Sequence, residues 1–245
     1  MQGTKRISVV TICYNAYEEL QHTLKSVAVQ DYPHIEYIVV DGASKDDSHK
    51  LFEEYRAHID VLISEPDNGI YDAMNKGIKV ATGDYICFMN AGDTFHSPIT
   101  LSKVFAQVGD NSPDIIYGET DLVDVQRNFI RHRRLSAPQT LTKESFLRGM
   151  LVCHQSFYPR RDLVPLYNLS YRFSSDYDWC IRILEKSRHN HNAHLVLTDY
   201  LSEGVTTQNH RASLLERFHV MRRHYGFTRT LLSHLYIFIR SLIKR

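Results

Sequence analysis

The first hundred residues alternate between short, continuous hydrophobic runs and longer stretches with hydrophobic residues at helical spacing. Continuous runs are typical of strands buried on both faces, and the spaced stretches are typical of amphipathic helices. The predicted strands are Ile7–Cys13, Tyr37–Val40, Val61–Ile63 and Tyr85–Met89, and the predicted helices are Tyr17–Gln30, Asp46–Ala57 and Ile70–Ala81. This alternation predicts βαβ units and therefore an α/β fold, with a mainly parallel sheet flanked by helices.

After about residue 113 the pattern is less regular. Strands are predicted at Asp114–Tyr117, Leu122–Ile130, His154–Tyr158 and His194–Leu201, and helices at Asp176–Lys186, Arg211–Tyr225 and Thr228–Lys244. We therefore expect one α/β domain over residues 1–205, followed by a helical extension over residues 206–245.

Polar residues follow the predicted strands of the first hundred residues, and ligands of open parallel sheets bind outside the carboxyl ends of the strands. Asp41 can accept a hydrogen bond from a ribose or a base, and Asp93 can hold a divalent cation together with substrate phosphates. The polar run Ser64–Gly77 leads into a helix start, which suits phosphate or hydroxyl groups. Helix caps and turns are the ordinary alternative for each of these residues.

Two acids, Asp176 and Asp178, stand at the head of a later predicted helix. The helix dipole alone favours acids at this position. The alternative is that one of them is a general base, which must lie within hydrogen-bond reach of the hydroxyl that it deprotonates.

Composition and missing motifs argue against several classes of protein. The net charge of +1 gives no general attraction for nucleic acid, so no nucleic-acid partner is expected. None of the four cysteines forms a CxxC pair, which favours reduced thiols in the cytoplasm. No histidine spacing matches a zinc site, and the absence of GxxxxGK[ST] and GxGxxG argues against NTPases and dinucleotide dehydrogenases.

The predicted helical extension is basic: residues 211–245 contain eight Lys or Arg and a single acid, Glu216. A basic amphipathic helix can lie in a membrane interface, which would make the protein peripheral at the inner face of the cell membrane. The alternative is a helix that packs on the domain by its apolar face, with solvated basic residues. No hydrophobic stretch reaches the length needed to span a bilayer.

Several motifs, taken in order, resemble those of the family 2 inverting glycosyltransferases, which have a GT-A fold, and in particular bacterial polysaccharide-biosynthesis glycosyltransferases. The motifs are Ser8–Asn15, Gln30–Tyr32, Glu36–Asp46, Glu65–Gly69, Asn75–Gly77, Phe88–Asp93 and Ser175–Asp178. Two positions depart from the family pattern. Gly42 replaces the second acid after the second strand, and the family's DxD motif keeps only its last acid, Asp93.

The resemblance implies transfer of a sugar from a UDP- or GDP-sugar donor to a hydroxyl of a glycan or lipid-linked acceptor. Asp176 would be the catalytic base, and Asp93 would bind Mn²⁺ or Mg²⁺. The residues implied on the nucleotide side are Tyr14, Asn15, Asp41, Asp67 and Asn75, and those on the acceptor side are His154, Gln155, Asp178 and Glu203. A catalytically inactive nucleotide-sugar-binding module and a nucleotidyltransferase remain the alternatives.

Overall fold

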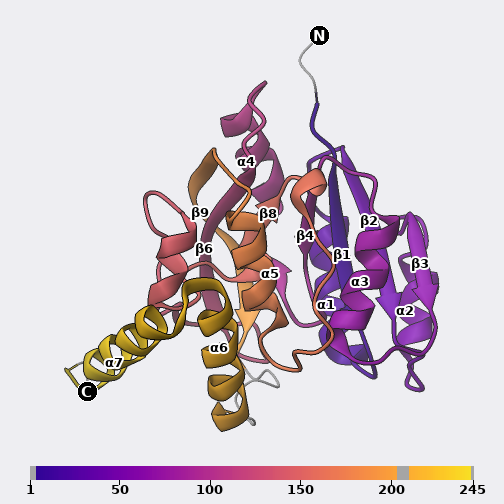
Figure 1. The fold of residues 1–245 in the computed structure, drawn as a ribbon. Helices are drawn as coiled ribbons and strands as arrows, with labels where there is room; N and C mark the ends of the chain where they lie inside the picture. The colour runs from indigo at the N-terminus through magenta and orange to yellow at the C-terminus, as the bar shows by residue number, and fades with distance from the viewer. Residues whose placement is uncertain (1–3, 203–209, 244–245) are drawn as a thin grey trace.

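The computed structural model describes residues 4–202 and 210–243 (Figure 1). Its first half consists of β1 (Ile7–Cys13), α1 (Tyr17–Ala28), β2 (Ile35–Asp41), α2 (Ser48–Glu54), β3 (Val61–Ser64), α3 (Ile70–Val80), β4 (Tyr85–Phe88), β5 (Thr94–Phe95) and α4 (Thr100–Val108). Its second half consists of β6 (Ile115–Val123), β7 (Phe129–His132), η1 (Lys143–Arg148), η2 (His154–Ser156), β8 (Phe157–Pro159), η3 (Arg161–Leu163), α5 (Ser175–Leu184), β9 (Asn190–Leu201), α6 (His210–Tyr225) and α7 (Phe227–Ile243).

The strands form two sheets. The first has the order β3-β2-β1-β4 and is entirely parallel, as the alternating pattern predicts. The second has the order β5-β9-β6-β7 with β8 also paired to β6, and only its β6–β9 pair is parallel. An isolated bridge between Tyr85 and Arg160 joins the two sheets at β4 and β8.

Every residue of β1 is buried, because helices cover both faces of the parallel sheet. Alternate side chains point to opposite sides. Val10 and Ile12 pack in a cluster with α3 and α5, and Val9 and Cys13 pack in a second cluster with α1 and α4. All four cysteines are buried free thiols.

Two local predictions were wrong. Leu122–Ile130 is not one strand: β6 ends at Val123 and β7 begins at Phe129. The carboxylate of Asp124 accepts a hydrogen bond from the backbone N–H of Asn128 (2.8 Å), which stabilises a turn between the strands. The last strand begins earlier than predicted: β9 starts at Asn190, four residues before His194.

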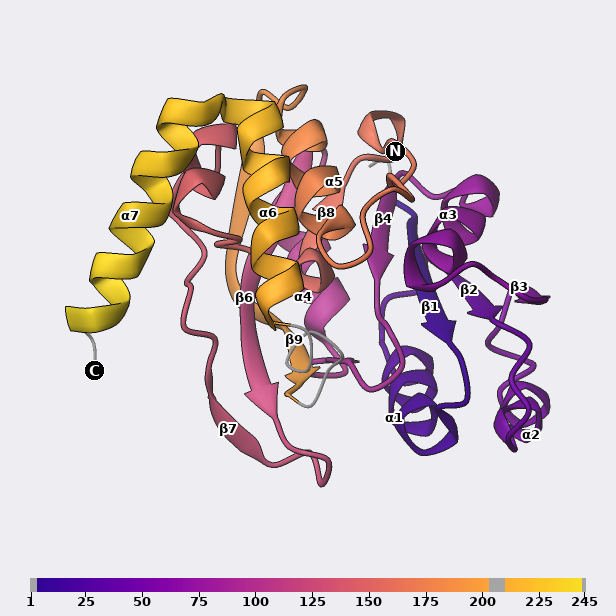
Figure 2. The same cartoon turned by 60° about the horizontal axis from the view of Figure 1, so that its bottom comes forward.

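The two C-terminal helices differ in how they pack. Val220 and Met221 of α6 are fully buried in the core cluster that also contains Trp179 of α5. Gly226, with φ of 81°, then turns the chain into α7, which forms an outer edge of the molecule in Figure 2. Within the described residues, we find no helix with the length and apolar character needed to cross a bilayer.

Candidate active site

A cavity of about 590 Å³ lies between the parallel sheet and the second sheet. It is lined by α3, the segment after β4, β7 with the residues that follow it, the segment around η2, α5, β9 and α6. Asp93 and Asp176, the two carboxylates to which the sequence assigns the metal and the base, both line this cavity. The fold therefore brings together acids that are 83 positions apart in the chain.

Asp93 is a buried carboxylate held by two protein donors. Its Oδ2 accepts a hydrogen bond from Gln155 Nε2 (2.8 Å), and its Oδ1 accepts one from the Leu201 N–H (3.2 Å). Burial raises the pKa of Asp93 to about 7, although these hydrogen bonds and the charge of Arg127 act in the opposite direction. The carboxyl is therefore poised to exchange a proton for a cation near neutral pH.

Asn90, which is not among the residues predicted from the sequence, offers a second oxygen suited to a cation. Its side-chain Oδ1 is buried without a hydrogen-bond partner, and the residue lines the same cavity as Asp93. A buried acceptor without a donor is unfavourable, so a cation is a fitting partner for it. One carboxylate and one amide oxygen are ligands suited to Mg²⁺ or Mn²⁺, with the remaining positions left to phosphates and water. The residues present thus fit a divalent cation.

The described residues contain another group of potential metal ligands. Ligand atoms of His96, Asp121 and Asp199 lie within 4.8 Å of one another. None of these residues lines the cavity. His96 Nδ1 already contacts Asp199 Oδ1 at 2.7 Å, so this group needs no ion to satisfy its polar atoms.

Asp176 lies in the first turn of α5. Its Oδ1 accepts hydrogen bonds from the Tyr177 N–H (2.8 Å) and the Tyr71 hydroxyl (3.3 Å). Its Oδ2 is 3.7 Å from His154 Nδ1, and its side chain is partly exposed to the cavity. The carboxylate is therefore fixed through one oxygen, which leaves the other available to a substrate hydroxyl.

His154 and Gln155, for which the sequence predicts a position on the acceptor side, both line the cavity. His154 is buried, its Nε2 has no hydrogen-bond partner, and burial lowers its pKa, so that the neutral ring is favoured. Gln155 is almost completely buried and links Asp93 to Cys153, whose thiol donates to Gln155 Oε1 (2.7 Å). Gln155 therefore positions Asp93.

Four of the residues predicted to bind the nucleotide gather at the carboxyl ends of β1 and β2. The Asp41 carboxylate is buried and accepts hydrogen bonds from the Ser44 and Ser64 hydroxyls (2.5 and 2.6 Å). Asn15 is joined to the same loop through the Lys45 N–H (2.8 Å), and the Tyr14 side chain is exposed.

The lack of a side chain at Gly42 lets the Asp67 carboxylate lie close to the loop after β2. A methyl carbon added at Gly42 would lie 2.5 Å from Asp67 Oδ2 and 3.2 Å from the Tyr14 ring. The Asp67 carboxylate, from a neighbouring loop, therefore occupies the space that a side chain at position 42 would need. The Ala91 N–H donates to the Ile12 carbonyl (3.1 Å), which connects this group to the segment that carries Asn90 and Asp93.

None of the residues predicted to bind the nucleotide lines this cavity, and Asn75 and Asp178 pair with other parts of the protein instead. Asn75 is buried, and its amide pairs with the backbone of Tyr167, with Oδ1 accepting at 2.7 Å and Nδ2 donating at 3.1 Å. The Asp178 carboxylate pairs with Arg182 and His224, both at 2.8 Å. Its side chain lies on a different face of α5 from that of Asp176, and this face points toward α6. These contacts indicate structural roles rather than nucleotide or acceptor binding. Glu203 lies outside the described residues.

Basic residues opposite the acids were not identified from the sequence. Arg131, Arg133 and Arg134 line the cavity from β7 and the residues after it, and Arg217 lines it from α6. Arg217 packs over the Tyr177 ring at 5.2 Å, and its Nε is buried without a hydrogen-bond partner. The short basic run at 131–134 was a usable signal, whereas nothing local marks Arg217.

The parallel α/β sheet, with acids and arginines around a cavity near its strand ends, has the GT-A fold of solved glycosyltransferases. The chain belongs to glycosyl transferase family 2, whose family model matches residues 8–164. It is thus a glycosyltransferase, as the ordered motifs predict.

Two similar sequences and one similar fold accompany the family match. A "PGL/p-HBAD biosynthesis glycosyltransferase" of Mycobacterium tuberculosis is 32% identical over 71% of this chain and 68% of its own length. The "putative teichuronic acid biosynthesis glycosyltransferase" TuaG of Bacillus subtilis is 23% identical over 90% of this chain and 92% of its own length. The mannosyltransferase PcManGT of Pyrobaculum calidifontis, solved with GDP-Man and Mn²⁺, superposes with a TM-score of 0.65 at 18% identity, over 95% of this chain and 70% of its own.

Proposed function

We propose that this glycosyltransferase inverts the anomeric centre while it moves a sugar from a nucleoside-diphosphate donor to a hydroxyl of a glycan or lipid-linked acceptor, in the synthesis of a surface polysaccharide. The observation that carries the proposal is the shared cavity of Asp93 and Asp176, with Asp176 fixed through one oxygen only. The name of TuaG supports the polysaccharide, and the ligands of PcManGT support the donor and the cation.

The proposed reaction uses the residues as they lie. Asp176 accepts the proton of the acceptor hydroxyl, and the oxygen of that hydroxyl attacks the anomeric carbon. The bond between this carbon and the diphosphate oxygen breaks on the opposite side, which inverts the centre and releases the nucleoside diphosphate. A divalent cation on Asp93 and Asn90 would supply positive charge to the leaving diphosphate. Arg131, Arg133, Arg134 and Arg217 add positive charge to the same cavity.

The donor side is proposed for the loops after β1, β2 and β3. The carboxylates of Asp41 and Asp67 are acceptors for ribose hydroxyls or a base N–H, and the exposed Tyr14 ring offers a surface on which a base can stack. Asn75 is left out of this binding site because its amide pairs with Tyr167.

The test uses the purified protein with UDP-glucose, UDP-GlcNAc or GDP-mannose, with and without Mn²⁺. Unfolding temperature reports binding, and release of nucleoside diphosphate reports transfer to water or to an added glycan. We expect one donor to stabilise the protein and to be turned over. Donor binding without any turnover would instead identify an inactive binding module, and release of pyrophosphate from a nucleoside triphosphate would identify a nucleotidyltransferase.

A further inference from the structure

Helix α7 turns its hydrophobic side to solvent. Phe227, Leu231, Leu235 and Ile239 follow one another at intervals of four residues and are 46–57% exposed, and Leu232 beside them is 61% exposed. Residues four apart on a helix lie on the same face. These five side chains, which we call the α7 apolar face, form a continuous stripe along the helix.

On the side of α7 that packs on the protein, several polar residues make the contacts. Thr230 is fully buried, and its hydroxyl donates to the Gly226 carbonyl (2.7 Å). The Ser233 hydroxyl donates to the Leu147 carbonyl of η1, and the His234 ring packs edge-on against Phe218 of α6 at 5.0 Å. A helix on a protein surface normally buries its apolar side. The five side chains of the α7 apolar face instead lie exposed to solvent, and an apolar stripe of this kind marks an interaction surface.

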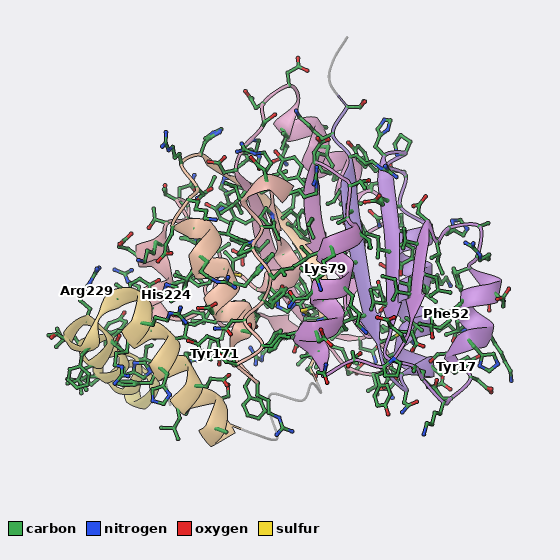
Figure 3. All side chains as sticks on the ribbon, turned by 45° about the vertical axis from the view of Figure 1, so that its right-hand side comes forward. Tyr17, Phe52, Lys79, Tyr171, His224 and Arg229 are labelled. Atoms are coloured by element: carbon green, nitrogen blue, oxygen red, sulfur yellow. The ribbon has the colours of Figure 1, made fainter. Side chains whose placement is uncertain are left out.

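Exposed basic residues accompany the α7 apolar face. Arg222, Arg223 and Arg229 are exposed on α6 and α7, and Figure 3 shows Arg229 at the outer side of these helices, away from the parallel sheet. The sequence from Phe227 onward contains no acid. Glu216, the one acid of α6, is occupied by the backbone N–H groups of Arg172 and Phe173 (2.7 and 2.6 Å).

We propose that the α7 apolar face inserts into the surface of an anionic lipid bilayer, with α7 parallel to the membrane plane. Exposed apolar residues beside cations are the features that bind an amphipathic helix to anionic lipid. Seventeen residues give a helix of about 25 Å, which lies along an interface. A second copy of the chain fits less well, because the exposed arginines of the two copies would be brought together. The proposal is independent of the donor and acceptor assigned above.

The experiment is flotation of the full chain with vesicles of phosphatidylcholine alone, or of phosphatidylcholine with phosphatidylglycerol. We expect binding to the anionic vesicles to exceed that to neutral ones about tenfold and to fall in high salt, because salt screens the arginines. The variant Leu231→Ser/Leu235→Ser/Ile239→Ser should lower binding at least about tenfold. The variant Arg222→Gln/Arg229→Gln should remove most of the preference for anionic lipid.

A matched control replaces three exposed apolar residues elsewhere, Val29→Ser/Leu62→Ser/Ile99→Ser. It should bind vesicles like the unmodified chain, and unfolding temperatures should show that all variants are folded. Equal binding by the α7 variant and the unmodified chain would overturn the proposal, as would absence of binding to anionic vesicles. A self-association in sedimentation that only the α7 substitutions abolish, without vesicle binding, would assign the face to a second copy instead.

Discussion

The side-chain amide of Gln155 donates a hydrogen bond of 2.8 Å to the carboxylate of Asp93, and both residues are almost completely buried. The two are 62 positions apart in the chain. This pair connects the η2 segment with the segment after β4, so the environment of the proposed metal ligand is set by a part of the chain outside the parallel sheet.

The first prediction concerns the pH dependence of stability. The pKa of Asp93 is raised to about 7 in the folded protein, so folding favours its protonated form. The stability from this group is complete below its unfolded pKa, near 4, and is lost as pH rises toward 7. In the metal-free protein, Asp93→Asn should therefore gain unfolding free energy relative to the unmodified chain between pH 5 and pH 8, by up to about 4 kcal/mol.

Chemical denaturation at several pH values measures this difference. The control is Asp110→Asn at an exposed position, which reports the effect of the same substitution on the protein surface. A flat profile for Asp93→Asn would contradict the raised pKa.

The second prediction separates the two groups of potential metal ligands. We expect Mn²⁺ to increase the thermal stabilisation by nucleoside diphosphate, and we expect Asn90→Ala and Asp93→Asn each to remove that increase. His96→Ala alters the other group, which does not line the cavity, and should leave the increase intact. Thermal-shift titrations with and without Mn²⁺ distinguish the two groups. If only His96→Ala removed the increase, the cation would be assigned to His96, Asp121 and Asp199 instead.

The third prediction tests the base. Asp176→Asn keeps an acceptor oxygen for Tyr71 and the Tyr177 N–H but can no longer take a proton. Sugar transfer should fall by roughly 10²–10⁴-fold while the donor still stabilises the protein. Transfer kinetics and thermal shift on the same preparation measure both effects. Unchanged turnover would remove Asp176 from the proposed role.

The fourth prediction concerns Asp178, two residues further along α5. Its carboxylate is 2% exposed and pairs with Arg182 and His224. Asp178→Asn leaves these cations without their partner and should lower the unfolding free energy by about 3–5 kcal/mol, with kcat preserved at temperatures where the variant is folded. Loss of kcat without loss of stability would instead support the acceptor-side role that the sequence predicts for Asp178.

The same contacts predict how pH acts through His224, which Figure 3 labels on α6. Burial acts to lower the pKa of His224, but its hydrogen bonds to Asp178 and Glu185 and their charges raise it overall. The stability from this ring is therefore complete at pH below about 6.5 and is lost as pH rises through its folded pKa. His224→Gln should lose stability mainly at acidic pH, as measured by denaturation at pH 5.5 and pH 8.5, and an equal loss at both values would argue against a charged ring.

The fifth prediction concerns Gly42. Its φ is not among the positive values, so alanine fits the backbone, but the added methyl must displace the Asp67 carboxylate. Gly42→Ala should weaken nucleoside-diphosphate binding about tenfold with little change in unfolding temperature. Asp67→Ala should weaken binding to a similar degree, and the double variant no further, because both changes act on one group. Calorimetry measures the three affinities, and additive effects would show that Gly42 acts separately from Asp67.

The sequence by itself determined the parallel half of the fold and the proposed chemistry of Asp93 and Asp176. Buried parallel strands give continuous hydrophobic runs, and the helices between them give a helical period, so β1 to β4 and α1 to α3 can be recognised locally. The two acids could be identified because they stand directly after a strand and at the start of a helix, within ordered motifs.

Only the tertiary structure decided which polar residues face the cavity and which face the protein interior. Asp178 and Asn75 stand within motifs but pair with α6 and with the Tyr167 backbone, whereas Gln155 and Arg217 reach the cavity from distant segments. The hydrophobic period of α7 located its apolar side but could not show that this side faces solvent. A periodic pattern specifies the face of an element, whereas long-range packing selects what that face contacts.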